Sequence, residues 1–229
     1  MSIFRKIGAV FILPIAWISA LLVRRKPMEM RYKKLQKWSR FIINYLGCNL
    51  EVEGTENIPS EGPILFVSNH QGTLDPTLII STVSRTMSFI SKKANEKRLV
   101  FGSWAITIGV IHFDQDSREG NVYMLREAAR RLKMGDSLLI FPEGTRSRGD
   151  AMNAFKAGAI QPAYLSKATI VPITLNNAYI INDKKTKNKK LKITFGTPKK
   201  YDEYKEYSYE EMSDILYSEI EKNIIYNDK

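Results

Sequence analysis

Seven short strand-like segments, with helical stretches between most of them, constrain the fold of this chain more than any other feature of its sequence. They occupy residues 50–53, 64–68, 87–91, 110–113, 138–141, 170–174 and 191–195. Two of these segments, residues 64–68 and 138–141, are apolar runs typical of strands buried on both faces. Helical patterns lie between most of the seven segments. This alternation predicts an α/β fold with a largely parallel sheet flanked by helices.

The composition of the chain predicts a single α/β domain with an N-terminal appendage. Of the 229 residues 44% are hydrophobic, which is enough for one substantial core, and no shift in composition marks a second domain. We expect membrane-binding helices in residues 1–47 and an α/β domain in residues 48–229.

The first apolar segment, residues 7–23, is uncharged and is interrupted by Pro14. Seventeen residues lie at the lower limit for crossing a bilayer, so the segment could span the membrane or lie in its interface. Basic residues at positions 5–6 resemble the start of a signal peptide. However, no small-x-small cleavage site follows, and residues 24–26 are basic, so we favour a retained membrane anchor.

The next stretch, residues 28–46, has an amphipathic pattern. An apolar helical face (Leu35, Trp38, Ile42 and Tyr45) lies beside basic side chains (Arg31, Lys33, Lys34, Lys37 and Arg40). Such a helix either packs on the globular domain or lies on an anionic leaflet, and the adjacent apolar segment favours the leaflet. The eight basic residues between positions 24 and 40 predict that the domain lies on the cytoplasmic side of a membrane.

The net charge of +11 predicts an anionic partner, which could be a nucleic acid, a lipid, a phosphorylated substrate or an acidic protein. No zinc-finger spacing or RNA-binding aromatic signature is present, so we expect no nucleic acid partner. Cys48 is the single cysteine, which excludes an intrachain disulfide and a multi-cysteine metal site. Eight lysines within residues 184–200 are typical of a solvated loop and hairpin, with a membrane-facing role as the alternative.

A polar motif, Asn-His-Gln-Gly-Thr-Leu-Asp, follows the apolar run at residues 64–68. Asp75 and Pro76 predict a helix start, with Asp75 as N-cap and Pro76 at the first helical position. A turn at Gly72 would let Asp75 contact His70, fix the imidazole tautomer through Nδ1 and leave Nε2 as a general base. Alternatively, Asp75 only caps the helix and His70 is an ordinary loop residue.

A second polar loop follows the apolar run at residues 138–141 and contains Glu143, Gly144, Arg146 and Arg148. Ligands of open α/β sheets bind beyond the carboxyl ends of the strands, so the two loops can converge on one site. Backbone amides around Gly144, together with Arg146, would bind a phosphate. The alternative is a surface turn in which Glu143 pairs with Arg146.

These two motifs, NHQGTLD and FPEGTRS, resemble the signature blocks of the membrane-associated glycerolipid acyltransferases, specifically the 1-acylglycerol-3-phosphate acyltransferases. The similarity covers roughly residues 54–174. It implies that His70 is the general base and that Asp75 orients it. It also assigns the acceptor's phosphate to a loop made of Glu143, Gly144, Thr145 and Arg146.

Residues 109–115 resemble a third block of that family, but His112 stands where Phe is usual and Gln115 where Arg is usual. The family associates this Arg with the acceptor's phosphate, so we expect Arg118 or Lys93 to supply the charge. Lys93 belongs to a basic segment that also resembles the family. We interpret His112 as a packed strand residue without a catalytic role.

Two further segments are similar to this family. Residues 171–173 resemble its fourth, hydrophobic block, which a structural strand explains equally well. Lys156 lies in a recurrent segment and could face the same anion, although a lone lysine is more often solvated.

The resemblance implies transfer of a fatty acyl group from acyl-CoA or acyl-ACP to the sn-2 hydroxyl of 1-acylglycerol-3-phosphate, which yields phosphatidic acid. We expect a membrane lipid acceptor, a membrane surface bound through residues 1–47, and no metal or other cofactor. The sequence has no Walker loop, no G-x-S-x-G elbow and no H-E-x-x-H site. The alternatives are acylation of glycerol-3-phosphate or another lysophospholipid, and a basic membrane-surface protein without catalysis.

Overall fold

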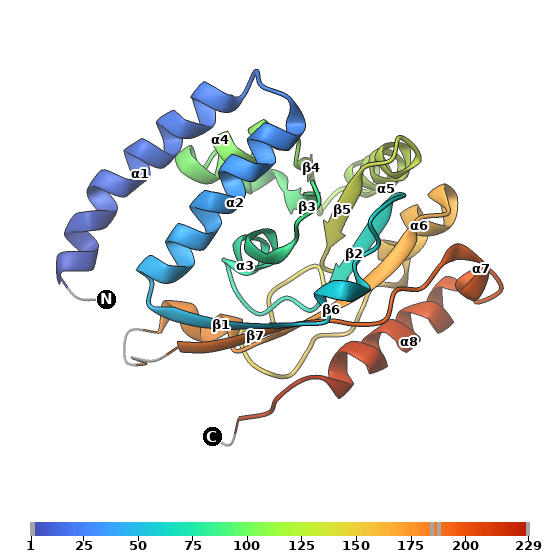
Figure 1. Cartoon of the computed structure of the whole chain (residues 1–229). Helices are drawn as coiled ribbons and strands as arrows, with labels where there is room; N and C mark the ends of the chain where they lie inside the picture. The colour runs from blue at the N-terminus through green and yellow to red at the C-terminus, as the bar shows by residue number, and fades with distance from the viewer. Residues whose placement is uncertain (1–2, 184–185, 187–188, 228–229) are drawn as a thin grey trace.

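All seven predicted strands form, and they belong to one sheet (Figure 1). The computed structural model describes residues 3–183, 186 and 189–227. The strand order is β1-β7-β6-β2-β5-β3-β4. The bounds of the strands are β1 Cys48–Glu53, β2 Ile64–Ser68, β3 Ser88–Lys92, β4 Ile111–Phe113, β5 Ser137–Ile140, β6 Thr169–Asn176 and β7 Lys189–Phe195.

The sheet is largely parallel, as predicted. Strands β6, β2, β5, β3 and β4 run in one direction, and β7 is antiparallel to β6. At the edge, β1 pairs in parallel with β7. Four adjacent parallel strands, β2, β5, β3 and β4, therefore end at the same side of the sheet.

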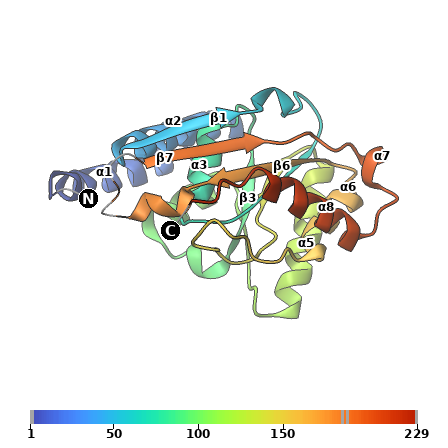
Figure 2. The ribbon, with the colours of Figure 1, turned by 90° about the horizontal axis from the view of Figure 1, so that it is seen from below.

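Helices cover both faces of the sheet (Figure 2). Alternate residues of β2 point to opposite faces: Ile64 and Phe66 pack with α2 and α3, whereas Leu65 and Val67 pack with α5, α6 and α8. The α-helices are α1 Ile3–Val23, α2 Met28–Tyr45, α3 Asp75–Thr82, α4 Leu99–Thr107, α5 Arg118–Lys133, α6 Gln161–Ser166, α7 Tyr201–Tyr204 and α8 Tyr209–Lys222. Short 3₁₀ helices are η1 Thr55–Asn57, η2 Lys93–Asn95, η3 Ala157–Ile160 and η4 Ala178–Asn182.

Helix α2 packs on α3, so the prediction that its apolar face lies on a leaflet is wrong. Leu35 packs against the core, and Trp38 Nε1 donates to Ser19 Oγ of α1 at 2.9 Å. Arg40 Nε donates to the Ser81 carbonyl at 2.8 Å, near the C-terminal end of α3, where helix carbonyls lack internal partners. The exposed lysines of α2 (Lys33, Lys34 and Lys37) face outward.

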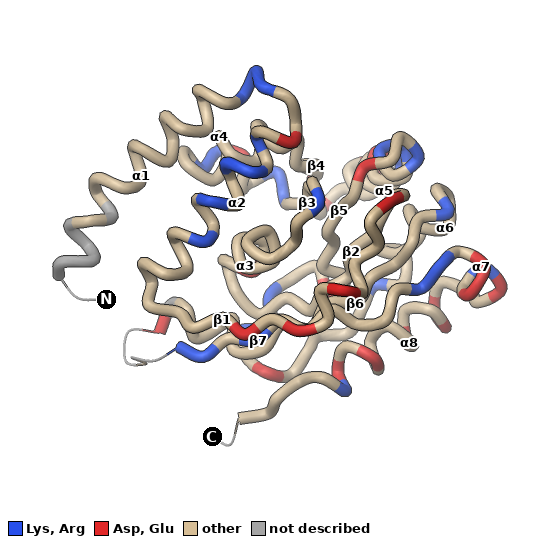
Figure 3. Tube along the Cα trace, viewed as in Figure 1, with Lys and Arg blue, Asp and Glu red and all other residues tan. Residues whose placement is uncertain are grey.

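Helix α1 packs on α4 and α2 through one narrow face that contains Ala16 and Ala20. Its other face exposes large apolar side chains: Val10, Phe11, Leu13, Ile15, Ile18, Leu21 and Leu22. Figure 3 shows basic residues at the turn after α1 and along α2. Within the part of the chain that the structure describes, no helix combines the length and the apolar character needed to cross a membrane.

The lysine-rich stretch is only partly solvated. Lys184, Lys185 and Lys187 lie outside the described residues. Lys189 is buried, whereas Lys192 pairs with Glu53 at 2.7 Å and Lys199 pairs with Glu219 at 2.7 Å. Several of these lysines therefore join elements of the fold.

His112 lies on the edge strand β4 and is a packed strand residue, as predicted. Its neighbour Phe113 faces the cavity described below, and both ring nitrogens of His112 are buried. Burial lowers the pKa of His112 below its ordinary value of 6.5, and the nearby Glu96 carboxylate opposes this shift.

The lowered pKa predicts that His112 destabilises the fold at acid pH. The unfolded chain binds a proton near pH 6.5 that the folded chain resists, so stability falls as pH decreases through 6.5. The free energy of unfolding of His112→Leu should fall less between pH 7.5 and 5.5 than that of the wild type. The difference should stay below about 1.4 kcal/mol per pH unit, the limit for one proton. Parallel curves from urea unfolding would contradict this assignment.

Candidate active site

The loops beyond four adjacent strands line one cavity of about 440 Å³. His70 follows β2, and Phe141 to Arg146 follow β5. Lys92 ends β3, and Gln115 follows β4. The two polar loops therefore meet at the carboxyl edge of the sheet, as their positions in the sequence predict.

The first loop is anchored by the two buried amides on either side of His70. Asn69 pairs with the backbone of β6: its Nδ2 donates to the Leu175 carbonyl at 2.9 Å, and its Oδ1 accepts from Leu175 N at 2.7 Å. Gln71 Oε1 accepts from Ala178 N at 2.8 Å. These bonds fix the backbone on both sides of His70.

The predicted contact between His70 and Asp75 is confirmed, because His70 Nδ1 lies 2.7 Å from Asp75 Oδ2. The buried carboxylate of Asp75 also accepts from Gln71 N at 2.7 Å and from Gly72 N at 2.8 Å. Gly72 fits closely here, since a Cβ atom would lie 3.0 Å from the Ala178 carbonyl oxygen and would require a small shift of this backbone. Asp75 is the first residue of α3 rather than its N-cap, which is Leu74, because its carboxylate turns back to the loop.

The imidazole ring of His70 is oriented toward the cavity. It stacks on Phe141, with ring centroids 4.1 Å apart and an interplanar angle of 21°. The His70 side chain is 20% exposed. With Nδ1–H donating to Asp75, Nε2 carries the lone pair, and it has no partner among the residues that the structure describes. This nitrogen can accept a proton from a hydroxyl in the cavity.

The second loop holds the backbone of His70 at both of its polar groups. Glu143 Oε1 accepts from His70 N at 2.6 Å, and Ser147 N donates to the His70 carbonyl at 2.7 Å. Glu143 Oε2 accepts from N and Nδ2 of Asn153, each at 2.8 Å. We call the His70 bonds to Glu143 and Ser147 the backbone clamp.

The carboxylate of Glu143 thus faces the protein, and Glu143 does not line the cavity. Burial raises its pKa above the ordinary value of 4.5, although the hydrogen bonds oppose that shift. The alternative ion pair with Arg146 does not form, since Arg146 Nη1 donates to Thr73 Oγ1 at 2.5 Å. Sequence reasoning grouped Glu143 with the phosphate ligands, but its partners give it a role in holding the two loops together.

Four basic side chains and no acidic side chain line the cavity: Lys92, Arg98, Arg146 and Lys156. Gly144 has a φ of +68°, and a Cβ there would lie 3.0 Å from Lys156 Nζ, so glycine permits the lysine to approach. The backbone N–H groups of Thr145 and Arg146 have no partner within the described ranges. The arrangement can bind an anion next to His70.

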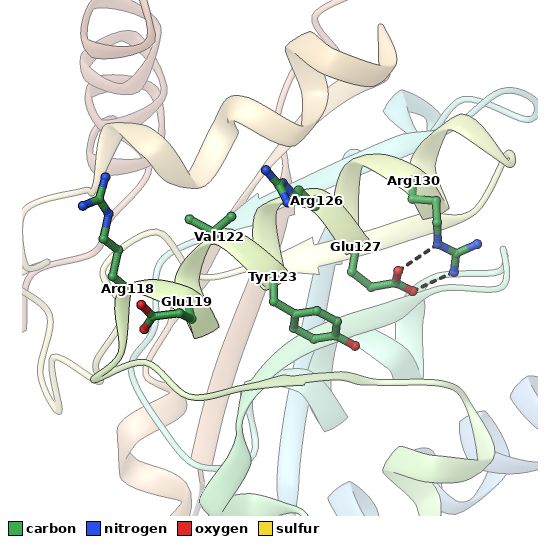
Figure 4. Close-up of a pocket in the computed structure, with 7 residues that line it drawn as sticks. All are labelled: Arg118, Glu119, Val122, Tyr123, Arg126, Glu127 and Arg130. Atoms are coloured by element: carbon green, nitrogen blue, oxygen red, sulfur yellow. Dashed lines mark hydrogen bonds and ion pairs between the residues drawn. The ribbon is translucent and has the colours of Figure 1, made fainter.

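Two predicted sources of positive charge lie outside the cavity wall. Lys93 begins η2 with an exposed side chain, and the preceding residue, Lys92, lines the cavity instead. Arg118 lies at the start of α5, in a shallow groove along that helix that Tyr123 and Arg126 also line (Figure 4). Arg98 was missed, because no sequence signal separates it from the neighbouring Lys97. In the part of the chain described, no group of three or more His, Cys, Asp or Glu residues could hold a metal ion.

Comparisons with known proteins give a consistent picture. The model of the Acyltransferase family matches residues 49–176. The chloroplastic 1-acyl-sn-glycerol-3-phosphate acyltransferase LPAT1 of Arabidopsis thaliana is 36% identical over 60% of this chain and 38% of its own length. The human 1-acyl-sn-glycerol-3-phosphate acyltransferase alpha is 30% identical over 74% of this chain and 60% of its own length.

The chain spans from 38% to 62% of the length of such relatives. The crystal structure of the 1-acyl-sn-glycerophosphate acyltransferase PlsC from Thermotoga maritima has the same fold, with a TM-score of 0.74 and 23% identity over 95% of each chain.

The hydrogen bonds that Glu143 accepts predict that the Glu143→Gln variant is less stable than the wild type. A glutamine offers one oxygen and places an amide donor opposite an N–H group, so the variant should lose about 1–3 kcal/mol of stability. Because burial raises the pKa of Glu143, the wild type should lose stability as pH rises from 4.5 through the folded-state pKa. Urea unfolding between pH 4.5 and 8 should therefore show the largest deficit of Glu143→Gln at the acid end.

The exposed residue Glu61 supplies the control. Glu61→Gln should unfold like the wild type across this pH range. A Glu143→Gln variant as stable as Glu61→Gln at every pH would show that the Glu143 bonds contribute nothing to stability.

Proposed function

Because this chain belongs to the Acyltransferase family, we propose that it transfers a fatty acyl group from an acyl thioester to the sn-2 hydroxyl of 1-acylglycerol-3-phosphate, forming phosphatidic acid. The observation that carries the proposal is the 2.7 Å bond from His70 Nδ1 to Asp75, which leaves Nε2 facing a cavity lined by basic side chains. The printed names of the relatives agree with this acceptor.

In the proposed reaction, His70 Nε2 takes the proton of the acceptor hydroxyl as its oxygen attacks the thioester carbon. The C–O bond forms, the tetrahedral intermediate collapses, and the C–S bond breaks. The imidazolium returns the proton to the departing thiolate. Asp75 stabilises the imidazolium through the Nδ1–H bond, and Glu143 keeps the histidine in place through its backbone.

The phosphate of the acceptor would be bound by the loop at Gly144, Thr145 and Arg146, with Lys156 beside it. A phosphate monoester carries about −1.5 to −2 charges at neutral pH, and a cavity without acidic side chains suits it. The placement of Lys92 in the cavity wall favours it over Lys93 as a further cation. The reaction needs acyl-CoA or acyl-ACP as co-substrate and no other cofactor.

A lipid acceptor also accounts for the exposed apolar face of α1 and the basic turn that follows it. We propose that this face docks on an anionic leaflet, with the domain on its cytoplasmic side. Docking would let the acceptor reach His70 with its own acyl chain still in the bilayer, since exposing the chain costs about 0.8 kcal/mol per CH₂ group. Glycerol-3-phosphate has no acyl chain and would not require this face.

Acyl transfer to 1-acylglycerol-3-phosphate by the wild type and His70→Ala tests the proposal. Loss of the general base should lower kcat about 10²–10⁴-fold. The matched control is His112→Leu at pH 7.5, which removes the other histidine without touching the cavity and should keep wild-type activity. Equal rates for wild type and His70→Ala would refute the catalytic role, and an inactive wild type would refute the substrate.

The docking proposal predicts weaker membrane binding when the apolar face of α1 is made polar. Ile18 and Leu22 lie one turn apart, and 48% and 73% of their surfaces are exposed. The double variant Ile18→Glu/Leu22→Glu should bind anionic phosphatidylglycerol vesicles at least tenfold more weakly in co-sedimentation, because each apolar side chain contributes about 1.5–3 kcal/mol when buried. Met134→Glu, at an exposed apolar residue after α5, should bind like the wild type. Unchanged binding of the double variant would rule out docking through α1.

A further inference from the structure

Arg98 brings a positive charge to the cavity from the connection between β3 and α4. It immediately precedes α4, lines the cavity at its rim and is exposed. Its guanidinium has no hydrogen bond or ion pair with any residue that the structure describes. The same holds for the ammonium group of Lys92, the last residue of β3, which directly precedes η2. Two unneutralised cations thus share one side of an acid-free cavity.

The other two cations belong to the segment that follows β5. Arg146 is held by Thr73, and Lys156 lies beside Gly144. On the side of β3 and β4, the remaining candidates do not contribute charge: Gln115 lines the cavity but is neutral, and Lys93 lies outside the wall. Lys92 and Arg98 therefore supply the positive charge on that side of the cavity.

Arg98 also lies at the start of α4, the helix that packs on α1. The next residue, Leu99, is 69% exposed, and α4 packs along α1 (Figure 1). Near its C-terminal end, α4 approaches α1, with the Thr107 hydroxyl oxygen 3.4 Å from the Ala20 carbonyl oxygen. A lipid whose acyl chain stays in the bilayer would present its phosphate at this edge of the cavity, whereas a water-soluble acyl carrier need not approach along α4.

We infer that Arg98, with Lys92, binds the phosphate monoester of the acceptor opposite Arg146 and thereby sets the selectivity for a phosphate monoester over other lysophospholipid headgroups. This inference rests on the proposed function. A dianionic phosphate is stabilised by cations on both sides of it, and an arginine fork adds two parallel hydrogen bonds to its oxygens. A zwitterionic headgroup would gain less, because its own cation repels Arg98.

Kinetics of Arg98→Gln in mixed micelles at fixed surface concentration test the inference. We expect KM for 1-acylglycerol-3-phosphate to rise about tenfold, the loss of one charge-assisted bond, with KM for the acyl donor changed less than about twofold. The preference for 1-acylglycerol-3-phosphate over lysophosphatidylcholine should fall by a similar factor. Lys97→Gln is the matched control, because Lys97 is the adjacent exposed cation and does not line the cavity.

A new cation introduced on the same cavity wall should restore acceptor binding in the Arg98→Gln variant. Gln115→Arg in the Arg98→Gln background should restore part of the acceptor KM, since both positions line the cavity. Vesicle binding by Arg98→Gln and Lys97→Gln should be equal, which separates headgroup recognition from general attraction to the membrane.

The outcomes separate this inference from the proposed function. An active wild type with an unchanged acceptor KM in Arg98→Gln would overturn the inference alone. A rise in the donor KM instead would assign Arg98 to the acyl carrier and overturn it as well. If the wild type transfers no acyl group, the proposed function fails. In that case the affinity for 1-acylglycerol-3-phosphate is compared between the His70→Ala variant and the double variant His70→Ala/Arg98→Gln. Equal affinities would overturn the inference.

Discussion

The geometry of the site depends on the backbone clamp, which joins the two polar loops at His70. Glu143 accepts from the amide of His70, and the carbonyl of His70 accepts from Ser147 N. Both loops leave the sheet at neighbouring strands, β2 and β5, so no long connection is needed to bring them together. Because the clamp acts on the main chain, the imidazole remains free to meet Asp75 on one side and the cavity on the other.

The buried carboxylates of Asp75 and Glu143 both contact the His70 loop, but they have different roles. Asp75 accepts from two backbone amides and from the imidazole, so its negative charge is directed at the ring of His70. Within the described residues, Glu143 accepts its hydrogen bonds from backbone and amide N–H groups and not from the imidazole. A buried carboxylate without such donors would be strongly destabilising, so each one persists because several donors offset its desolvation.

The sequence predicted the seven strands because short strand-like segments alternate with helical patterns, and two of them, residues 64–68 and 138–141, are apolar runs too short for a typical helix. It also predicted the contact between His70 and Asp75, since Gly72 permits the tight turn between them. It could not predict that Glu143 turns inward, because that orientation depends on Asn153, ten residues away. The packing of α2 on α3 could not be predicted either, since the sequence pattern of an apolar helical face is the same whether the face packs on protein or on lipid. Arg98 differs from Lys97 only through the path of the chain into α4.

The distribution of positive charge in the cavity suits the proposed position of the acceptor phosphate. Arg146 and Lys156 approach from the loop that clamps His70, so a phosphate bound there is positioned relative to the imidazole by the same segment. Arg98 approaches from the helix that packs on α1, so a phosphate bound there is positioned relative to the apolar face. An acceptor phosphate held between Arg146 and Arg98 would fix how deep the lipid lies in the bilayer. It would also fix the distance from the acceptor hydroxyl to His70 Nε2. Under the proposed function, membrane docking and general-base catalysis would be parts of one geometric requirement, and Arg98 would connect them.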